Sequence, residues 1–123
     1  MDTPLLITVV DDDESVRESL PDLLREFGFR VQAFSCAMDF LASEYLAQTR
    51  CLILDIAMPG MSGLELQKEL KLRRYDIPII FITAHGDPAE RPRLMSQGAV
   101  ECLMKPFSEA ALLKALSAAL PVS

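Results

Sequence analysis

The chain has 123 residues, half of them hydrophobic, which suffices for one compact domain with a buried core and leaves little room for a second. Its twelve basic and eighteen acidic residues give a formal net charge of −6, the wrong sign for contact with phosphate backbones, so direct nucleic-acid binding is not expected. The three cysteines lack the spacing of a zinc site or a disulfide framework, and no apolar run reaches the length of a membrane span. We therefore expect a soluble protein of the reducing cytoplasm, with no membrane contact.

Five short apolar runs predict β-strands, in chain order at residues 5–10, 30–34, 51–55, 77–83 and 100–104. The first, third and fourth runs are almost continuously apolar, which is typical of parallel strands covered on both faces, whereas the second alternates like an edge strand. Helical spacing of apolar residues predicts five helices in the intervals, at 16–27, around 40–45, at 64–72, around 90–97 and from 108 to 120. This alternation predicts an α/β fold with a doubly wound parallel sheet.

Polar residues and prolines predict where these helices begin. Ser35, Ser62 and Ser108 are placed to cap the second, third and fifth helices, because a serine hydroxyl can accept a hydrogen bond from the first turn. Pro92 falls where the fourth helix should already be running, and a proline in a helix interior costs about 3 kcal/mol but is tolerated in the first turn. We expect this helix to begin late, near Arg91 or Pro92, and to be short or mobile.

Carboxylates stand where two of the predicted strands end. Asp11, Asp12 and Asp13 follow the first strand, and Asp55 ends the third. The carboxyl ends of strands in a doubly wound sheet border one crevice, so these side chains should meet. Clustered carboxylates repel one another unless a cation neutralises them, and magnesium prefers oxygen ligands, so the cluster predicts a magnesium site. The alternative is a solvated helix N-terminus, where the helix dipole favours aspartate.

Thr83 ends the fourth strand and Lys105 follows the fifth, so both would border the same crevice. A lysine offers a point charge, and a threonine a hydrogen bond, to phosphoryl oxygens. An aspartate carboxylate can itself be the nucleophile that forms an acyl phosphate. Together with the carboxylates, these residues indicate phosphoryl transfer to an aspartate.

Four motifs carry a resemblance that covers nearly the whole chain: VVDDDESVR (9–17), LDIAMPGMSGLEL (54–66), FITAHGD (81–87) and GAVECLMKPF (98–107). The chain resembles the receiver domains of two-component response regulators, and is most similar to the nitrogen-fixation-regulator branch, whose members often carry a C-terminal helix-turn-helix domain. The resemblance implies one receiver domain over residues 1–123, with a flavodoxin-like five-stranded sheet in the order 2-1-3-4-5 and five helices. It also implies a DNA-binding output domain, which we expect to have been excised from this chain.

The resemblance gives roles to the residues at the strand ends. It implies that Asp55 accepts a phosphoryl group from a phosphohistidine on a sensor histidine kinase. It implies a Mg²⁺ ion, replaceable by Mn²⁺, and its ligands would be Asp11, Asp12, Asp55 and the backbone carbonyl of Ala57. Thr83 would be the switch hydroxyl and Lys105 would pair with the phosphoryl group. The bond from Lys105 to Pro106 is expected to be cis.

Phosphorylation would draw Thr83 and Lys105 inward and switch the face built from the fourth helix, fifth strand and fifth helix. The family often dimerises through that face. The chain would then act on an output domain, its own or a separate one, to regulate transcription. It would be no enzyme beyond catalysing its own phosphorylation and dephosphorylation.

Two residues bear on how such a switch would be tuned. The family usually has an aromatic residue three positions before the lysine, where this chain has Cys102, and we expect that thiol to pack in the interior rather than to sense redox state. His85, two residues after Thr83, could hydrogen-bond near the phosphoryl group and set its lifetime. The alternative for His85 is an exposed loop residue.

Three other functions fit parts of the pattern. A haloacid-dehalogenase-type phosphatase also uses aspartate, threonine, lysine and magnesium, and Asp11 and Asp13 have its spacing, but the motif around Asp55 would be unexplained. A flavodoxin-type carrier needs a phosphate loop after the first strand, where DDDE would repel phosphate. The third alternative is a receiver-like interaction module that binds partners without being phosphorylated.

Overall fold

The strands of the molecule form one parallel sheet in the order β2-β1-β3-β4-β5, in a computed structural model that describes residues 4–84 and 90–120. The strands are β1 (Leu6–Val10), β2 (Arg30–Phe34), β3 (Thr49–Asp55), β4 (Ile79–Thr83) and β5 (Glu101–Met104). The helices between and after them are α1 (Glu14–Glu26), α2 (Ala37–Leu41), α3 (Gly63–Leu72), α4 (Glu90–Ser96) and α5 (Glu109–Ala119). The predicted flavodoxin-like fold is confirmed. In the two described ranges, no helix is both long and apolar enough to cross a membrane.

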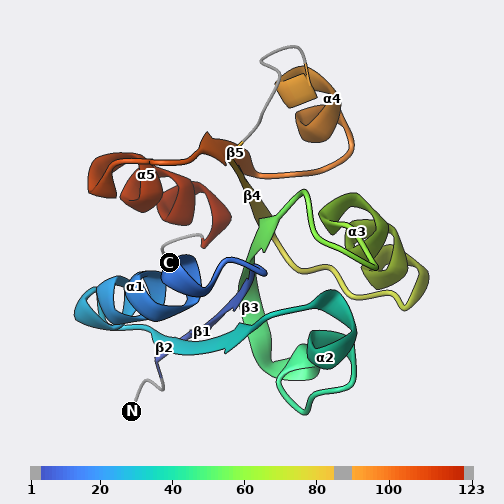
Figure 1. Ribbon diagram of the computed structural model, residues 1–123, viewed down its shortest axis with the longest axis horizontal. Helices are drawn as coiled ribbons and strands as arrows, with labels where there is room; N and C mark the ends of the chain where they lie inside the picture. Colours follow the sequence, from blue (N-terminus) through green and yellow to red (C-terminus); the bar gives the residue numbers. More distant parts are fainter. Residues whose placement is uncertain (1–3, 85–89, 121–123) are drawn as a thin grey trace.

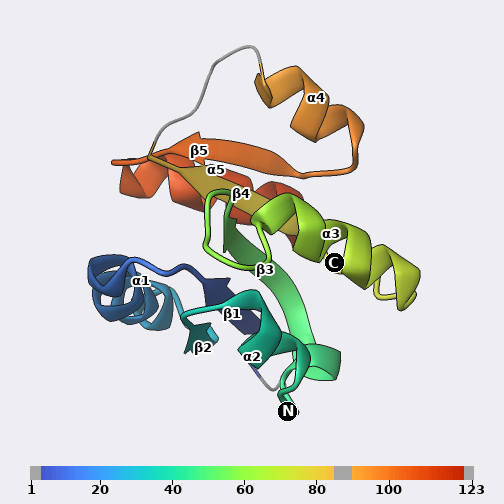
Figure 2. The ribbon, with the colours of Figure 1, turned by 45° about the vertical axis from the view of Figure 1, so that its right-hand side comes forward.

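Helices cover both faces of the sheet, with α1 and α5 on one side and α2, α3 and α4 on the other (Figure 1). Figure 2 shows the same three layers from a second direction. Because successive side chains of a strand point to opposite faces, β3 contributes Cys51 and Ile53 to the core under α1 and α5, and Leu52 and Leu54 to the other core. A central strand in this position must be apolar on both faces, which explains the continuous apolar runs in the sequence.

Two of the three predicted serine caps are confirmed. Ser62 accepts a hydrogen bond from the backbone N–H of Glu65, whose side chain accepts one in return from the Ser62 N–H, so that both orphan donors of this turn are satisfied. Ser108 accepts a hydrogen bond from Ala111 N–H at the start of α5. These caps fix the starts of the two helices that follow β3 and β5.

The predicted second helix is shorter than expected, and its predicted cap is wrong. Helix α2 has five residues, its N-cap is Cys36 rather than Ser35, and the Cys36 side chain makes no capping bond. The Ser43 hydroxyl donates to the Phe40 carbonyl and accepts from the Tyr45 N–H. A serine that bonds its own backbone in this way competes with the helix, so the chain turns before Tyr45 and continues as a short 3₁₀ helix, Leu46–Gln48.

Helix α4 covers Glu90–Ser96 within the described residues, and the preceding residues 85–89 lie outside them. The expected late start near Arg91 or Pro92 therefore stays a prediction. Leu94 anchors the helix to the core, since its side chain is only 3% exposed.

Candidate functional site

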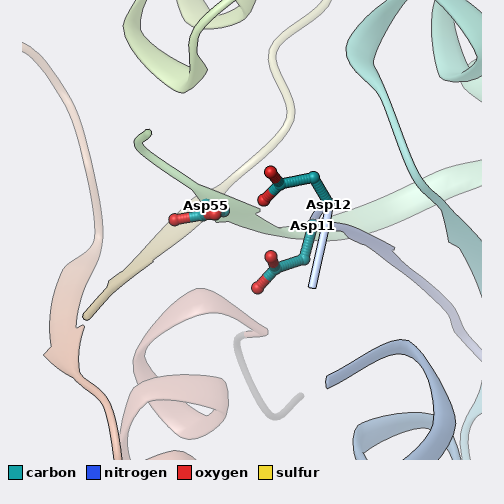
Figure 3. A group of neighbouring side chains, drawn as sticks. All are labelled: Asp11, Asp12 and Asp55. Carbon is teal, nitrogen blue, oxygen red and sulfur yellow. The ribbon is translucent and has the colours of Figure 1, made fainter. Parts of the chain in front are cut away.

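Three carboxylates meet at the carboxyl edge of the sheet. Asp11 follows β1, Asp12 is its neighbour, and Asp55 is the last residue of β3. One oxygen of each lies within 4.8 Å of the others, and Figure 3 shows the three side chains gathered at the strand ends. Asp11 and Asp55 are buried, at 0% and 5% exposure, whereas Asp12 is open to solvent. The sequence prediction that these residues meet is therefore correct in geometry.

The turn after β1 is held by hydrogen bonds that begin and end on its aspartates. Asp11 N–H donates to the Phe34 carbonyl, and Asp13 N–H donates to Asp11 Oδ1 at 2.9 Å. Asp13 Oδ1 accepts from both the N–H and the hydroxyl of Ser15, which makes Asp13 the N-cap of α1. Asp13 is thus used by the helix and is not part of the carboxylate cluster, which removes the Asp11 and Asp13 pair that the phosphatase alternative required.

Lys105 provides the positive charge of the site. Its Nζ lies 2.8 Å from Asp11 Oδ2 and 4.0 Å from Asp55 Oδ2, and its side chain is 15% exposed. Lys105 is therefore paired with Asp11, the nearer of its two carboxylate neighbours. The Lys105 N–H donates to the Thr83 carbonyl, and the peptide bond from Lys105 to Pro106 is cis, as the resemblance implied.

The site has more negative charge than Lys105 balances. Burial, followed by the charge of the neighbouring Asp11 and hydrogen bonding to it, raises the pKa of Asp55 to about 7, while the charge of Lys105 opposes the change. Burial alone would lower the pKa of Lys105, but hydrogen bonding to Asp11 and the charges of Asp11 and Asp55 outweigh it, so its pKa is raised. Three carboxylates against one ammonium leave an excess of two negative charges when all are ionised.

Residues 7–117 match the response regulator receiver domain, which is most of the chain. The chain belongs to this family. This receiver domain is 47% identical over 117 residues to nodulation protein W of Bradyrhizobium diazoefficiens, covering 95% of this chain and 52% of that protein. It is 41% identical over 120 residues to transcriptional regulatory protein FixJ of Azorhizobium caulinodans, covering 98% of this chain and 57% of that protein. The structure of response regulator StyR is similar with a TM-score of 0.86 and 52% identity, covering 96% of this chain and 60% of that one. The receiver domain spans about half the length of these curated relatives.

The other residues predicted for the site differ in burial and position. Thr83 is buried at the end of β4, next to β3 in the sheet. Ala57 is exposed in the loop after Asp55. Cys102 is partly buried and packs against the core under α2, α3 and α4, and its place in the switch stays a prediction. His85 lies outside the described residues.

Sequence reasoning missed two residues of the receiver domain that support the aspartates. Gly63, at the start of α3, lies so close to Asp55 that a Cβ there would overlap the Asp55 carbonyl oxygen, and its N–H donates to the Ile56 carbonyl. Arg17 reaches back from α1, and its Nη1 donates to the Asp11 carbonyl at 3.0 Å. Both contacts depend on how loops fold back, and the spacing of residues gives no signal for either.

A groove opens beside Lys105 between α1 and the connection from β5 to α5. Its volume is about 480 Å³, and it is lined by apolar side chains of α1 and by Pro106 and Phe107, with Asp13, Ser15 and Lys105 at its polar end. The groove brings solvent-accessible apolar surface next to the carboxylate cluster of the receiver domain. A partner that reaches Asp55 has a surface to contact there.

Proposed function

We propose that this receiver domain accepts a phosphoryl group on Asp55 from a phosphohistidine of a sensor histidine kinase, and thereby switches an output domain that regulates transcription. The observation that carries the proposal is the pair of uncompensated negative charges at Asp11, Asp12 and Asp55, beside a lysine suited to a phosphoryl group. The similarity to FixJ, a transcriptional regulatory protein, supports an output that regulates transcription. We place the protein in the cytoplasm, where a kinase domain and DNA are both accessible.

The carboxylates fit a divalent cation. Mg²⁺, or Mn²⁺ in its place, would be held by oxygen atoms of Asp11, Asp12, Asp55 and the backbone carbonyl of Ala57. When bound, the ion would neutralise charge on the carboxylates and on the phosphoryl oxygens. The raised pKa of Asp55 supports this assignment, because ionising a buried carboxyl beside Asp11 is unfavourable until a cation offsets the charge.

The side chains of the chain would then carry out the transfer. An ionised Asp55 oxygen attacks phosphorus, and an O–P bond forms while the N–P bond to the kinase histidine breaks, the electron pair returning to the imidazole nitrogen. Lys105, 4.0 Å from the Asp55 carboxylate, would pair with a phosphoryl oxygen. The Thr83 hydroxyl would donate a hydrogen bond to another. The groove between α1 and the β5–α5 connection would receive the kinase.

The response would be read on the face of α4, β5 and α5. Met104 on β5 and Leu113 on α5 are 48% and 41% exposed, so this face offers apolar surface to a second copy or to an output domain. Movement of Thr83 and Lys105 toward the phosphoryl group would be transmitted through β4 and β5, with Cys102 in place of the usual aromatic. His85 would tune the lifetime of the phosphorylated state. The domain would catalyse no reaction besides its own phosphorylation and dephosphorylation.

Intact-mass spectrometry after incubation with Mg²⁺ and acetyl phosphate tests the proposal. Wild type should gain one phosphoryl group that is labile in base, and Asp55→Asn should gain none. Asp13→Asn is the matched control, because it removes a carboxylate from the same edge that caps α1 instead of joining the cluster, and it should still be phosphorylated. Absence of the adduct in wild type that binds Mg²⁺ would favour an interaction module that works without phosphorylation.

A further inference from the structure

The peptide unit that joins Asp11 to Asp12 is held by a hydrogen bond from a side chain of α1. The carbonyl of Asp11 belongs to the same planar unit as the Asp12 nitrogen, so a hydrogen bond to that carbonyl fixes the direction in which the chain enters Asp12. Arg17 Nη1 makes this bond at 3.0 Å, and the arginine is itself partly buried. The Arg17 backbone N–H also donates to the Asp13 carbonyl, so one residue ties both ends of the turn to α1.

The other bonds of the turn end on the neighbours of Asp12. Asp13 N–H donates to Asp11 Oδ1, and Asp13 Oδ1 accepts from Ser15. Asp12 itself is exposed, so its carboxylate is positioned through the backbone on either side of it. Loosening the Asp11 carbonyl would therefore let Asp12 swing away from Asp11 and Asp55.

We propose that Arg17 is a positioning residue that presents Asp11 and Asp12 to a divalent cation, an inference that rests on the proposed metal site. The contact is informative because geometry and charge make opposite predictions. A guanidinium near three carboxylates repels an incoming cation, so its removal would strengthen Mg²⁺ binding if charge alone mattered. If Arg17 holds the turn, its removal weakens binding, as the loss of groups that orient metal ligands generally does.

The test compares Arg17→Ala and Arg17→Lys with Arg25→Ala by calorimetric titration with MgCl₂. Arg25 lies on the same helix, is exposed and pairs with Asp22, so its replacement removes the same charge without touching the turn. We expect Arg17→Ala to weaken Mg²⁺ affinity about 10-fold, Arg17→Lys to recover part of the loss through its one donor group, and Arg25→Ala to bind as wild type does. Binding by Arg17→Ala that equals or exceeds wild type would overturn the proposal.

A second readout needs no metal. In EDTA, the Asp13 N–H should exchange with solvent faster in Arg17→Ala than in wild type and Arg25→Ala, because its bond to Asp11 Oδ1 loses the support of a fixed Asp11 carbonyl. Unchanged exchange would count against Arg17 as a positioning residue even if the variant unfolds more easily. Failure of wild type to bind Mg²⁺ would instead reject the proposed metal site, and the two failures are thus distinguishable.

Discussion

The turn after β1 and the helix after β4 border the same edge of the sheet but are held in opposite ways. The turn has a fully buried carboxylate, Asp11, and partly buried hydrogen bonds that cross-link it to α1. Helix α4 covers Glu90–Ser96, and two of its three polar ties are exposed. The three ties are the pair of Arg91 with Glu101, the Arg91 side chain being 54% exposed, and the bonds from Gln67 and Lys71 to the Gln97 carbonyl.

This difference separates the part that must stay still from the part that can respond. Groups that present charge to a metal lose function if they shift, and buried, mutually satisfied bonds resist shifting. Exposed ion pairs and a single buried anchor are exchanged for water contacts at little cost, so α4 is the cheaper element to displace. A new charge on Asp55 would therefore be expressed at α4 rather than in the turn.

The largest expected effect concerns the repulsion between the buried carboxylates Asp11 and Asp55. The pKa of Asp55 is about 7 in the folded protein against 3.8 for an ordinary aspartate, so the folded state holds the proton more tightly than the unfolded one. The stability that this residue contributes is therefore lost as the pH rises from about 4 to about 7, by an amount on the order of 4 kcal/mol. In urea unfolding with EDTA, Asp55→Asn should gain stability over wild type at pH 8 and gain little near pH 4.

An exposed aspartate provides the control for that measurement. Asp22, whose side chain is 79% exposed, should give an Asp22→Asn variant whose difference from wild type does not grow with pH. Addition of Mg²⁺ should remove most of the advantage of Asp55→Asn, since a bound cation offsets the same repulsion. A pH-independent difference for Asp55→Asn would mean that the neighbouring charges do not raise the pKa of the Asp55 carboxyl.

Removing the apolar anchor of α4 should have the next largest effect. Leu94→Ala deletes a side chain that is 3% exposed, and we expect a loss of about 2 kcal/mol, near the low end for core leucines because a short helix can settle into the gap. Amide exchange should rise throughout α4 and leave the turn after β1 protected. Equal loss of protection in both regions would contradict the proposed independence.

A smaller loss of stability should follow from removing the hydrogen bond that joins α3 to the end of α4. Gln67 is 4% exposed and its Nε2 donates to the Gln97 carbonyl at 3.3 Å, so Gln67→Met removes the donor while keeping the volume. We expect the free energy of unfolding to fall by about 1 kcal/mol, because Lys71 still donates a hydrogen bond to that carbonyl. Gln48→Met is the matched control, since its donated bond to Glu44 is exposed, and urea unfolding should hardly distinguish it from wild type.

The ion pair of Arg91 with Glu101 should contribute least. A double-mutant cycle with Arg91→Ala and Glu101→Gln is expected to give a coupling energy of about 0.5 kcal/mol that shrinks in high salt, as for other exposed pairs. Glu101 also accepts a hydrogen bond from Cys102 N–H, so the single Glu101 variant alone would overstate the pair. A salt-independent coupling well above 1 kcal/mol would make α4 more firmly held than its exposure indicates.

Features that repeat along the sequence were predictable, and contacts made by folding back were not. Apolar runs and helical spacing predicted the strands, and the fold follows from them because parallel strands need covering helices. The meeting of Asp11, Asp55 and Lys105 followed from the rule that strand ends share an edge. The roles of these residues in phosphoryl transfer stay predictions.

The failures have local physical causes. Ser35 has the right type for a cap, but α2 begins one residue later, with Cys36 as its N-cap. The helix ends before the predicted Tyr45, where the Ser43 hydroxyl bonds the Phe40 carbonyl and the Tyr45 N–H. By sequence, Asp13 is equivalent to its two neighbours, but in the structure it is the N-cap of α1. The reach of Arg17 to a carbonyl six residues away depends on where α1 sits after the turn, which no periodicity encodes.

Gly63 acts on Asp55 through the side chain that it lacks. With no side chain of its own, it lets the first turn of α3 rest directly on the Asp55 carbonyl. Any library of single substitutions screened for signalling should therefore return position 63 beside the aspartates, although glycine offers no functional group. A residue without a functional group can thus be required at a site because its small size lets a neighbouring element pack closely.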